Sequence, residues 1–255
     1  MKRHNNSRHR QDYGCNHLMQ NDLFDGPSGS EAAPHVLSEL VRERSSTPAS
    51  VIHTLGQDLI IEYPKAFDPS LSLKVFDAID LTTPWRQDEI RIAGRTIPVP
   101  RLQCWMGDEH CRYAYSNISL HPVPWTQEMA SIRDFINKVS GTDFNCVLIN
   151  KYRSGEDSVS WHADDEPELG PSPRIASLSL GATRRFQLKR KPSLGLSDTE
   201  LSERVAMNLR SGSLLIMEPG VQENWVHQIA KTKVIVGVRI NLTFRVIEGA
   251  VNGNS

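Results

Sequence analysis

One stretch near the C-terminus, residues 234–247, constrains the fold of this chain more than any other. Apolar side chains occupy every second position, and the positions between them carry Gly237, Arg239, Asn241, Thr243 and Arg245. Side chains of a β-strand point alternately to opposite faces, so the pattern predicts one long strand over residues 234–247. Its polar face is either exposed to solvent or lines a cavity. Two arginines at even spacing suit a bound carboxylate, because a guanidinium offers paired donors; pairing with Asp or Glu inside the fold is the alternative.

Several shorter strands are expected before this one. They cover residues 145–152, 175–180, 185–190, 205–209, 213–218 and 225–229, with turn residues such as Gly181, Gly212 and Pro219-Gly220 between them. Many short strands with little helix between them predict a double sheet, of which the jelly roll is one form. The expected fold class is therefore mainly β with flanking helices, and its core spans about residues 145–247. Residues 192–204 are polar and are expected to form a surface loop.

The first half of the chain is expected to be mixed. A strand fits residues 58–63, and a helix begins at Asp68-Pro69 and runs to about Ile79. Residues 86–106 predict two strands joined by a tight hairpin at Ala93-Gly94. Apolar residues at steps of three and four predict a second helix over 126–139, with Gly141 beyond its end. Residues 1–50 are polar and show no period, so a disordered tail is expected there, followed by one domain over 51–250.

Composition narrows the class of protein. The net charge is −1, so no overall basic field points to nucleic acid, although local basic clusters can still exist. The four cysteines form no C-x-x-C pair and no secretory leader precedes them, which favours reduced thiols in an intracellular protein, nuclear or cytoplasmic. No apolar run reaches the 18 residues of a membrane span, so a soluble protein without membrane contact is expected.

The strongest chemical signal is a set of three metal ligands. His162 and Asp164 lie two residues apart on an extended segment, so their side chains point to the same side. His227 follows 65 positions later. Two imidazoles and one carboxylate form the facial triad of non-haem Fe(II) oxygenases, whereas a hydrolytic zinc site is the alternative. The arginines of residues 234–247 favour Fe(II) with a dicarboxylate cosubstrate.

Residues 145–245 resemble the AlkB family of Fe(II)- and 2-oxoglutarate-dependent dioxygenases. The resemblance is carried by Asn150-Lys151-Tyr152, residues 161–166, His227 and residues 239–245, and it extends more weakly back to about Ile61. Residues 157–170 and 175–186 are most similar to the animal-type repair branch. The resemblance implies a double-stranded β-helix (jelly roll) core, Fe(II) held by the three ligands above, and dioxygen at an open position. It also implies that 2-oxoglutarate binds to Asn150, Tyr152, Arg239, Asn241 and Arg245.

The same resemblance implies a nucleotide-recognition region over about residues 86–120. Tyr113 and Tyr115 match positions that hold a flipped base, and Glu166 matches the acidic residue that recognises the edge of the base. A carboxylate there suits a methylated adenine or cytosine, which is cationic. A basic stretch over residues 184–191 contains five cations and is expected either to hold phosphates or to be a solvated strand end.

One departure from the family bears on the substrate. Relatives that prefer duplexes insert a bulky aromatic wedge from a hairpin, and the matching residue here is Ala93. Intercalation relies on a large apolar side chain, so this protein is expected to favour single-stranded DNA or RNA unless Ile92 takes the place of the wedge.

The resemblance therefore implies oxidative demethylation of N-alkylated bases, such as 1-methyladenine and 3-methylcytosine, by a monomeric enzyme. The methyl group is hydroxylated and leaves as formaldehyde, and succinate and carbon dioxide are the coproducts. Two alternatives stay open: a hydroxylase of a protein or small molecule, and a non-catalytic nucleic-acid-binding module on the same fold.

Overall fold

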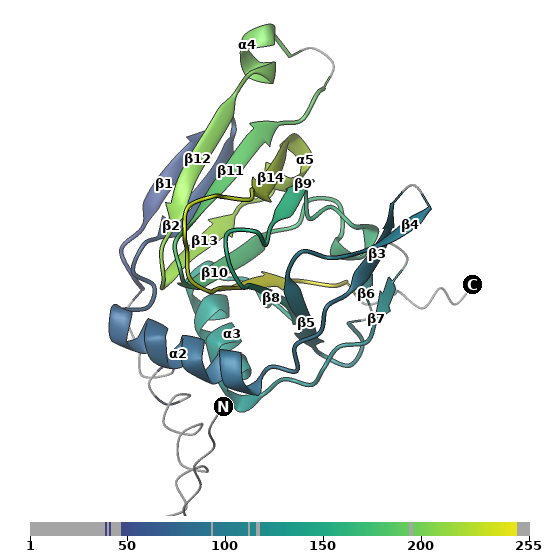
Figure 1. The fold of residues 1–255 in the computed structure, drawn as a ribbon. Helices are drawn as coiled ribbons and strands as arrows, with labels where there is room; N and C mark the ends of the chain where they lie inside the picture. The colour runs from purple at the N-terminus through teal and green to yellow at the C-terminus, as the bar shows by residue number, and fades with distance from the viewer. Residues whose placement is uncertain are drawn as a thin grey trace, which may run out of the picture.

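Two β-sheets and two helices form three layers (Figure 1). The computed structural model describes residues 39, 41, 47–92, 94–111, 113–115, 118–193 and 196–248, and at residues 92, 113–115 and 118–120 it describes the backbone alone. The large sheet has seven antiparallel strands, in the order β1 (Val51–Leu55), β2 (Asp58–Tyr63), β13 (Ser213–Met217), β10 (Ile175–Gly181), β15 (Arg239–Arg245), β8 (Cys146–Tyr152) and β5 (Leu102–Gly107). The small sheet has four strands, in the order β12 (Arg204–Leu209), β11 (Arg184–Arg190), β14 (Trp225–Ile229) and β9 (Val159–His162).

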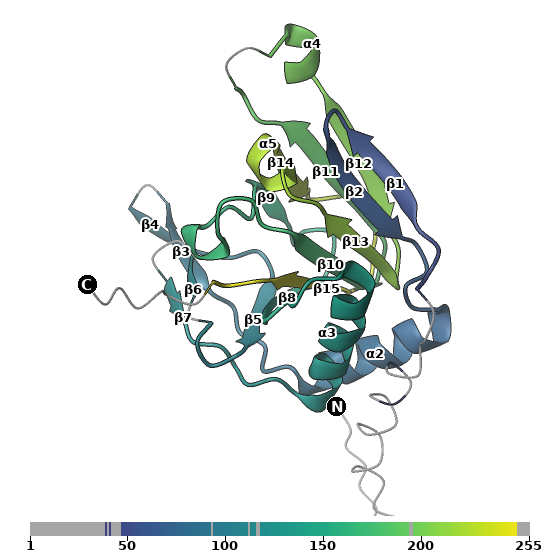
Figure 2. The same ribbon diagram turned by 180° about the vertical axis from the view of Figure 1, so that it is seen from behind.

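Two apolar cores separate the layers. The first lies between the large sheet and the helices, where Val75 and Ile132 pack with Leu178 and Leu242. The second lies between the two sheets, where buried side chains of both, such as Met217 and Leu188, meet. This sandwich of antiparallel sheets is the mainly β fold with flanking helices that the strand pattern predicts. Figure 2 shows both helices beside the large sheet.

Strand β15 confirms the alternation but is shorter than predicted. Ile240 and Leu242 face the helices, whereas Arg239 lines the space between the sheets. The prediction of one strand over residues 234–247 is wrong at both ends, since Val234 is 68% exposed and Ile235 is fully exposed. The physical reason is the extent of the neighbours: Arg239 pairs with Gly181 and Tyr152, the last residues of β10 and β8, and Arg245 pairs with the first residue of β8.

Both predicted helices are present. Helix α2 (Pro69–Thr82) begins after Asp68, whose side chain accepts a hydrogen bond from the Leu71 amide, and runs three residues beyond Ile79. Helix α3 (Gln127–Ser140) begins after Thr126, which caps the Met129 amide. Gly141 ends it in the left-handed conformation (φ 68°), which suits glycine because it has no Cβ.

The remaining elements agree in part with the prediction. The six short strands of residues 145–229 form within one residue of the expected positions. The polar segment 192–204 is not only a loop, because it contains helix α4 (Asp198–Leu201), which Ser197 and Glu200 cap reciprocally. Strands β1, β7 (Ile118–Leu120) and β9, a third strand in the region of residues 86–106, the 3-10 helix Pro167–Leu169 and the short helix α5 (Val221–Asn224) were not predicted.

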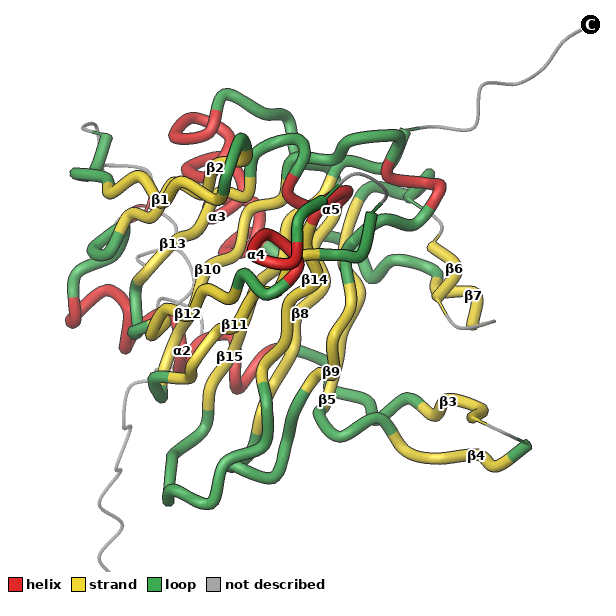
Figure 3. Tube along the Cα trace, turned by 90° about the horizontal axis from the view of Figure 1, so that it is seen from above, coloured by secondary structure: helices red, strands yellow, loops and turns green. Residues whose placement is uncertain are grey.

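Two β-hairpins lie outside the two sheets: among the described residues, their strands form no ladder with the large sheet or with the small sheet. Strands β3 (Glu89–Ile92) and β4 (Arg95–Pro98) form the predicted hairpin, and β6 (Tyr113–Tyr115) pairs with β7 (Ile118–Leu120). Both project to one side of the sandwich (Figure 3). Ala93, the position of the missing wedge, and the Ile92 side chain lie outside the described residues.

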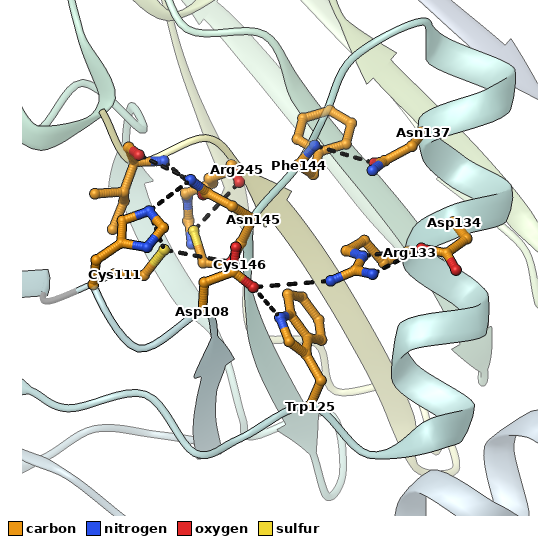
Figure 4. Close-up of polar contacts among 12 residues, drawn as sticks. Asp108, Cys111, Trp125, Arg133, Asp134, Asn137, Phe144, Asn145, Cys146 and Arg245 are labelled. Carbon is orange, nitrogen blue, oxygen red and sulfur yellow. Dashed lines mark hydrogen bonds and ion pairs between the residues drawn. The ribbon is translucent and has the colours of Figure 1, made fainter. Parts of the chain in front are cut away.

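Three further expectations concern the cysteines, the tail and the membrane. Cys104, Cys111 and Cys146 are free and buried, and the Cys146 thiol donates to the Arg245 carbonyl (3.3 Å), as Figure 4 shows. Most of the expected tail lies outside the described residues, but Val41 is 1% exposed in the first core, so packing begins before residue 51. Among the described helices, none has the length and apolar character needed to cross a membrane.

Candidate metal centre and carboxylate pocket

The three predicted metal ligands converge on the small sheet. His162 ends β9, Asp164 follows two residues later, and His227 lies on β14 directly opposite His162 in the sheet register. Their ligand atoms all lie within 4.8 Å of one another, and the two imidazole rings stand edge to face with centroids 4.3 Å apart. One carboxylate and two imidazoles on one side of a cavity match the donor set of a facial Fe(II) site.

The hydrogen bonds around the ligands orient them for a metal. The Nδ1 atom of His162 donates to the Ser160 carbonyl (2.8 Å), which leaves Nε2 as the metal-binding nitrogen. The backbone amide of Asp164 donates to Oε1 of Gln222 on helix α5 (3.0 Å), and Lys191 donates to the Gln222 carbonyl (2.8 Å). Gln222 is 1% exposed, so this contact fixes the loop that carries the carboxylate.

The charges of the site keep its ligands in their metal-binding forms. Burial opposes ionisation of Asp164, but the nearby Arg245 guanidinium and the two histidines hold the pKa of its carboxyl well below the usual range. Arg245 Nη2 donates to Asp164 Oδ1 at 2.5 Å. Burial and the neighbouring His162 lower the pKa of His227 to about 3, so its imidazole is neutral at pH 7. An ionised carboxylate and a neutral imidazole are the species that bind a divalent cation.

Arg239 lies on the opposite wall, on the large sheet. Its side chain is 1% exposed, and burial lowers its pKa to about 10, so it remains charged at pH 7. Nη2 donates to Ser179 Oγ (2.9 Å) and Asn241 Oδ1 (2.6 Å), whereas Nε and Nη1 have no hydrogen-bond partner among the described residues. A buried guanidinium with unsatisfied donors is costly, and a ligand carboxylate in the cavity would satisfy both. This wall of the pocket therefore fits one carboxylate of a ligand that reaches towards the metal ligands.

The neighbouring polar residues line the same cavity. Asn150 lies opposite Asn241 and Tyr152 lies opposite Arg239 in the sheet register, and the Tyr152 ring is 5.2 Å from the Arg239 guanidinium. The Asn150 oxygen accepts hydrogen bonds from Arg101 Nε (2.8 Å) and Gln103 Nε2 (3.0 Å), so its amide nitrogen is the donor that it offers to the cavity.

Two of the residues expected to bind 2-oxoglutarate make contacts within the protein. Asn241 accepts from Arg239 and from Ser177 Oγ (3.0 Å), and its nitrogen donates to Thr243 Oγ1 (2.7 Å). Its amide therefore orients Arg239. Arg245 pairs with Asp164, which is the alternative of internal pairing noted for the arginines, and both side chains are 4% exposed.

The structure does not place the side chains expected to bind the substrate in the lining of this cavity. Tyr113 and Tyr115 share strand β6, of which the backbone alone is described. Glu166 is half-buried, two residues after Asp164, and is not among the residues that line the cavity.

Residues 184–191 were expected either to hold phosphates or to form a solvated strand end, and neither alternative fits three of the five cations, which make contacts within the protein. Arg184 is 3% exposed and donates to three carbonyls, those of residues 154, 157 and 230. Arg190 packs on the Trp225 ring beside Asp58, and Lys191 pairs with Asp165. Arg184 and Arg190 point into the fold because they alternate with the outward-facing positions of β11.

Residues that the sequence did not single out also build the site. Gln222 holds the Asp164 loop, Arg101 and Gln103 orient Asn150, and Ser179 holds Arg239. Arg101 is 6% exposed and lines the cavity. Each of these contacts joins elements far apart in the chain, and no local spacing signals them.

Comparison with known proteins gives one family. The profile of the 2OG-Fe(II) oxygenase superfamily matches residues 60–245. The chain is 38% identical over 194 residues to alpha-ketoglutarate-dependent dioxygenase alkB homolog 3 of Rattus norvegicus, covering 75% of this chain and 65% of the relative, which is less than two thirds of that protein. It is 34% identical to DNA oxidative demethylase ALKBH2 of Mus musculus (76% of this chain, 83% of the relative) and 33% identical to ALKBH2 of Homo sapiens (90% and 94%).

Proposed function

Because the chain belongs to the AlkB family of the 2OG-Fe(II) oxygenase superfamily, we propose that it oxidatively demethylates N-alkylated bases in nucleic acid. The products from the base are the repaired base and formaldehyde, and 2-oxoglutarate is converted to succinate and carbon dioxide. An intracellular location and action as a monomer belong to the same proposal.

One observation carries the proposal: three metal ligands and an unsatisfied arginine face one cavity from opposite walls. His162 and His227 come from the small sheet, Asp164 comes from the loop after β9, and Arg239 comes from the large sheet. A hydrolytic zinc site would explain the ligands but not a buried guanidinium with two open donors. A non-catalytic binding module would need neither the three metal ligands nor the open arginine donors.

Bound Fe(II), with 2-oxoglutarate and dioxygen, would supply the oxidising power for hydroxylating a methyl group. The triad would hold the iron, and Arg239 would pair with the distal carboxylate of 2-oxoglutarate, with Asn150 and Tyr152 beside it in the cavity lining. Arg245 neutralises Asp164 and fixes its Oδ1 oxygen, and Oδ2, which lies 3.9 Å from Nε2 of His227, is the oxygen that would bind the metal.

The substrate assignment rests on the relatives and on residues 86–120. Two of the named relatives are DNA oxidative demethylases. The hairpins β3–β4 and β6–β7 lie in this region, and we assign to Tyr113 and Tyr115 the stacking of the target base and to Glu166 the recognition of its cationic edge. Base stacking on an aromatic ring contributes about 1–3 kcal/mol per base.

Formaldehyde release from an oligonucleotide that contains 1-methyladenine or 3-methylcytosine tests this function. We expect release that requires both Fe(II) and 2-oxoglutarate, and no release by Asp164→Asn, which keeps the shape of the ligand but not its charge. Uncoupled conversion of 2-oxoglutarate without formaldehyde would favour a protein or small-molecule substrate. Absence of iron binding in the wild-type protein would favour the binding module.

Single strands are the proposed form of the substrate. A duplex must be unpaired and unstacked at a cost of a few kcal/mol before chemistry, and a wedge recovers part of that cost. With Ala93 in place of a wedge, we expect duplex activity to be lower by about tenfold or more, since each 1.36 kcal/mol is a factor of ten in rate. Equal rates on one oligonucleotide, alone and annealed, would contradict this, and Ala93→Phe should narrow the difference.

A further inference from the structure

The outer face of the small sheet, turned away from the metal ligands, carries a group of basic side chains around one tryptophan. We call Trp161, Arg185, Lys189 and Arg204 the outer patch. On β11, Phe186 and Leu188 are buried between the sheets, so Arg185 and Lys189 between them point outwards. Arg185 and Arg204 are exposed. A hollow in this face includes Trp161, Arg185 and Arg204, and no acidic residue lines it.

The register of the sheet places two cations directly opposite each other. Lys189 on β11 pairs with Arg204 on β12, and like charges in a direct cross-strand pair are destabilising. Neither side chain forms an ion pair with a described residue: Arg204 donates to the carbonyls of Leu201 and Glu203, and the Lys189 ammonium lies 4.6 Å from the centre of the Trp161 ring. The two charged groups are therefore directed to different neighbours, and both remain available to an anionic ligand on the outer face.

The outer patch is joined to the metal centre through one strand. Trp161 precedes the ligand His162 on β9, so the two side chains lie on opposite faces of the same strand. Strand β9 is an edge of the small sheet, and His162 is the only half-exposed ligand of the triad, while Asp164 and His227 are 3% and 5% exposed. The cavity therefore opens beside β9, and a polymer that enters it there can pass around this edge onto the outer face.

Building on the proposed function, we propose that the outer patch binds the phosphodiester backbone of the nucleic-acid strand that carries the target base. Lys189 and Arg204, on the two strands of the small sheet farthest from β9, contact phosphates several nucleotides away from the flipped nucleotide, and Trp161 keeps the Lys189 ammonium on the side of β9. The chain thereby gains affinity for a polyanion despite its net charge of −1.

The test is the salt dependence of binding to a labelled single strand of about 16 nucleotides, the upper end of the span that one small domain covers. Binding is measured with Mn(II) in place of Fe(II) and with 2-oxoglutarate present. For single strands, log K falls with log salt by about 0.7 per phosphate contact, so Lys189→Gln/Arg204→Gln should reduce the slope by about 1.4. The matched control is Lys65→Gln/Lys74→Gln, which removes two exposed charges, one shortly before helix α2 and one on that helix.

The outcomes separate this inference from the proposed function. We expect the double variant to keep the wild-type melting temperature and the wild-type turnover of a methylated trinucleotide, which is too short to reach the outer patch. An unchanged salt slope, or an equal loss in the control variant, overturns the inference. A wild-type protein that binds strands through the outer patch but releases no formaldehyde from any substrate refutes the proposed function alone.

Discussion

Replacement of Arg239 by lysine should weaken 2-oxoglutarate binding while leaving the metal ligands in place. The Nη2 atom of Arg239 is engaged with Ser179 and Asn241, and Nε and Nη1 are the two donors that remain for a ligand carboxylate. Lysine keeps the positive charge but offers one point of contact instead of a pair. The variant therefore loses about one charge-assisted hydrogen bond, which contributes about 1.5–3 kcal/mol. Since 1.36 kcal/mol is a factor of ten, the dissociation constant should rise about 10- to 150-fold.

Calorimetric titration of 2-oxoglutarate into the Mn(II)-loaded protein measures this change directly. Arg153→Lys is the matched control, because Arg153 also makes a paired contact with a carboxylate, that of Asp157 (2.7 and 2.9 Å), but is not among the residues that line the cavity. We expect the control to bind 2-oxoglutarate as the wild type does. Wild-type 2-oxoglutarate affinity in Arg239→Lys, or a loss of nucleic-acid affinity in its place, would refute the assignment of this wall of the cavity.

Three further predictions follow from buried charges. Asp164→Asn and Asp164→Ala should both abolish turnover, and both should lower the melting temperature because each removes the carboxylate paired with buried Arg245. The alanine variant should be the less stable of the two, because asparagine keeps an oxygen that accepts the hydrogen bond from Arg245 Nη2; equal melting temperatures of the two variants would contradict this. Burial opposes ionisation of Asp157, but hydrogen bonds from Arg153 hold its pKa below the usual value. The ionised carboxylate therefore stabilises the fold above a pH of about 4, and this stabilisation is lost as the pH falls further. Asp157→Asn should therefore lower the melting temperature at pH 7, and the difference from wild type should shrink below a pH of about 4; a constant difference would be inconsistent with the pairing. Asp58 is 4% exposed and accepts hydrogen bonds from the Trp225 indole (3.0 Å) and the Asn224 amide (3.1 Å). Asp58→Ala should therefore lower the free energy of unfolding, measured with denaturant, by about 3–5 kcal/mol. The control Asp77→Ala, at an exposed position, should cause no measurable loss.

The residues of the site differ in how far the sequence could predict them. His162, Asp164 and His227 could be identified because their types and spacing define a donor set, and the structure brings them together. Gln222 could not, because its contact with the Asp164 amide spans 58 positions and depends on how helix α5 is placed. A buried glutamine on a short helix gives no local signal of that role.

Two incorrect predictions have definite causes. The ends of β15 are set by where its neighbours β8 and β10 stop, and alternation within residues 234–247 carries no information about those neighbours. The basic stretch could have been read more closely: Arg184 and Arg190 share the parity of Phe186 and Leu188, so alternation alone places them on the buried face. The prediction counted the charges of residues 184–191 without asking which of them face outwards, and so it placed the two inward-facing arginines on the protein surface.

The two hairpins beside the sandwich bear on how such a protein can diversify. Strands β3–β4 and β6–β7 pair with neither sheet among the described residues, so their loss or lengthening breaks no ladder that supports the metal ligands. An isolated two-stranded hairpin is at best marginally stable, so each of these hairpins depends on contacts outside itself for its own stability. Under the proposed function, base recognition lies in the hairpins and the oxidising chemistry in the sheets, so exchange of a hairpin between relatives should change the preferred base and leave iron binding intact.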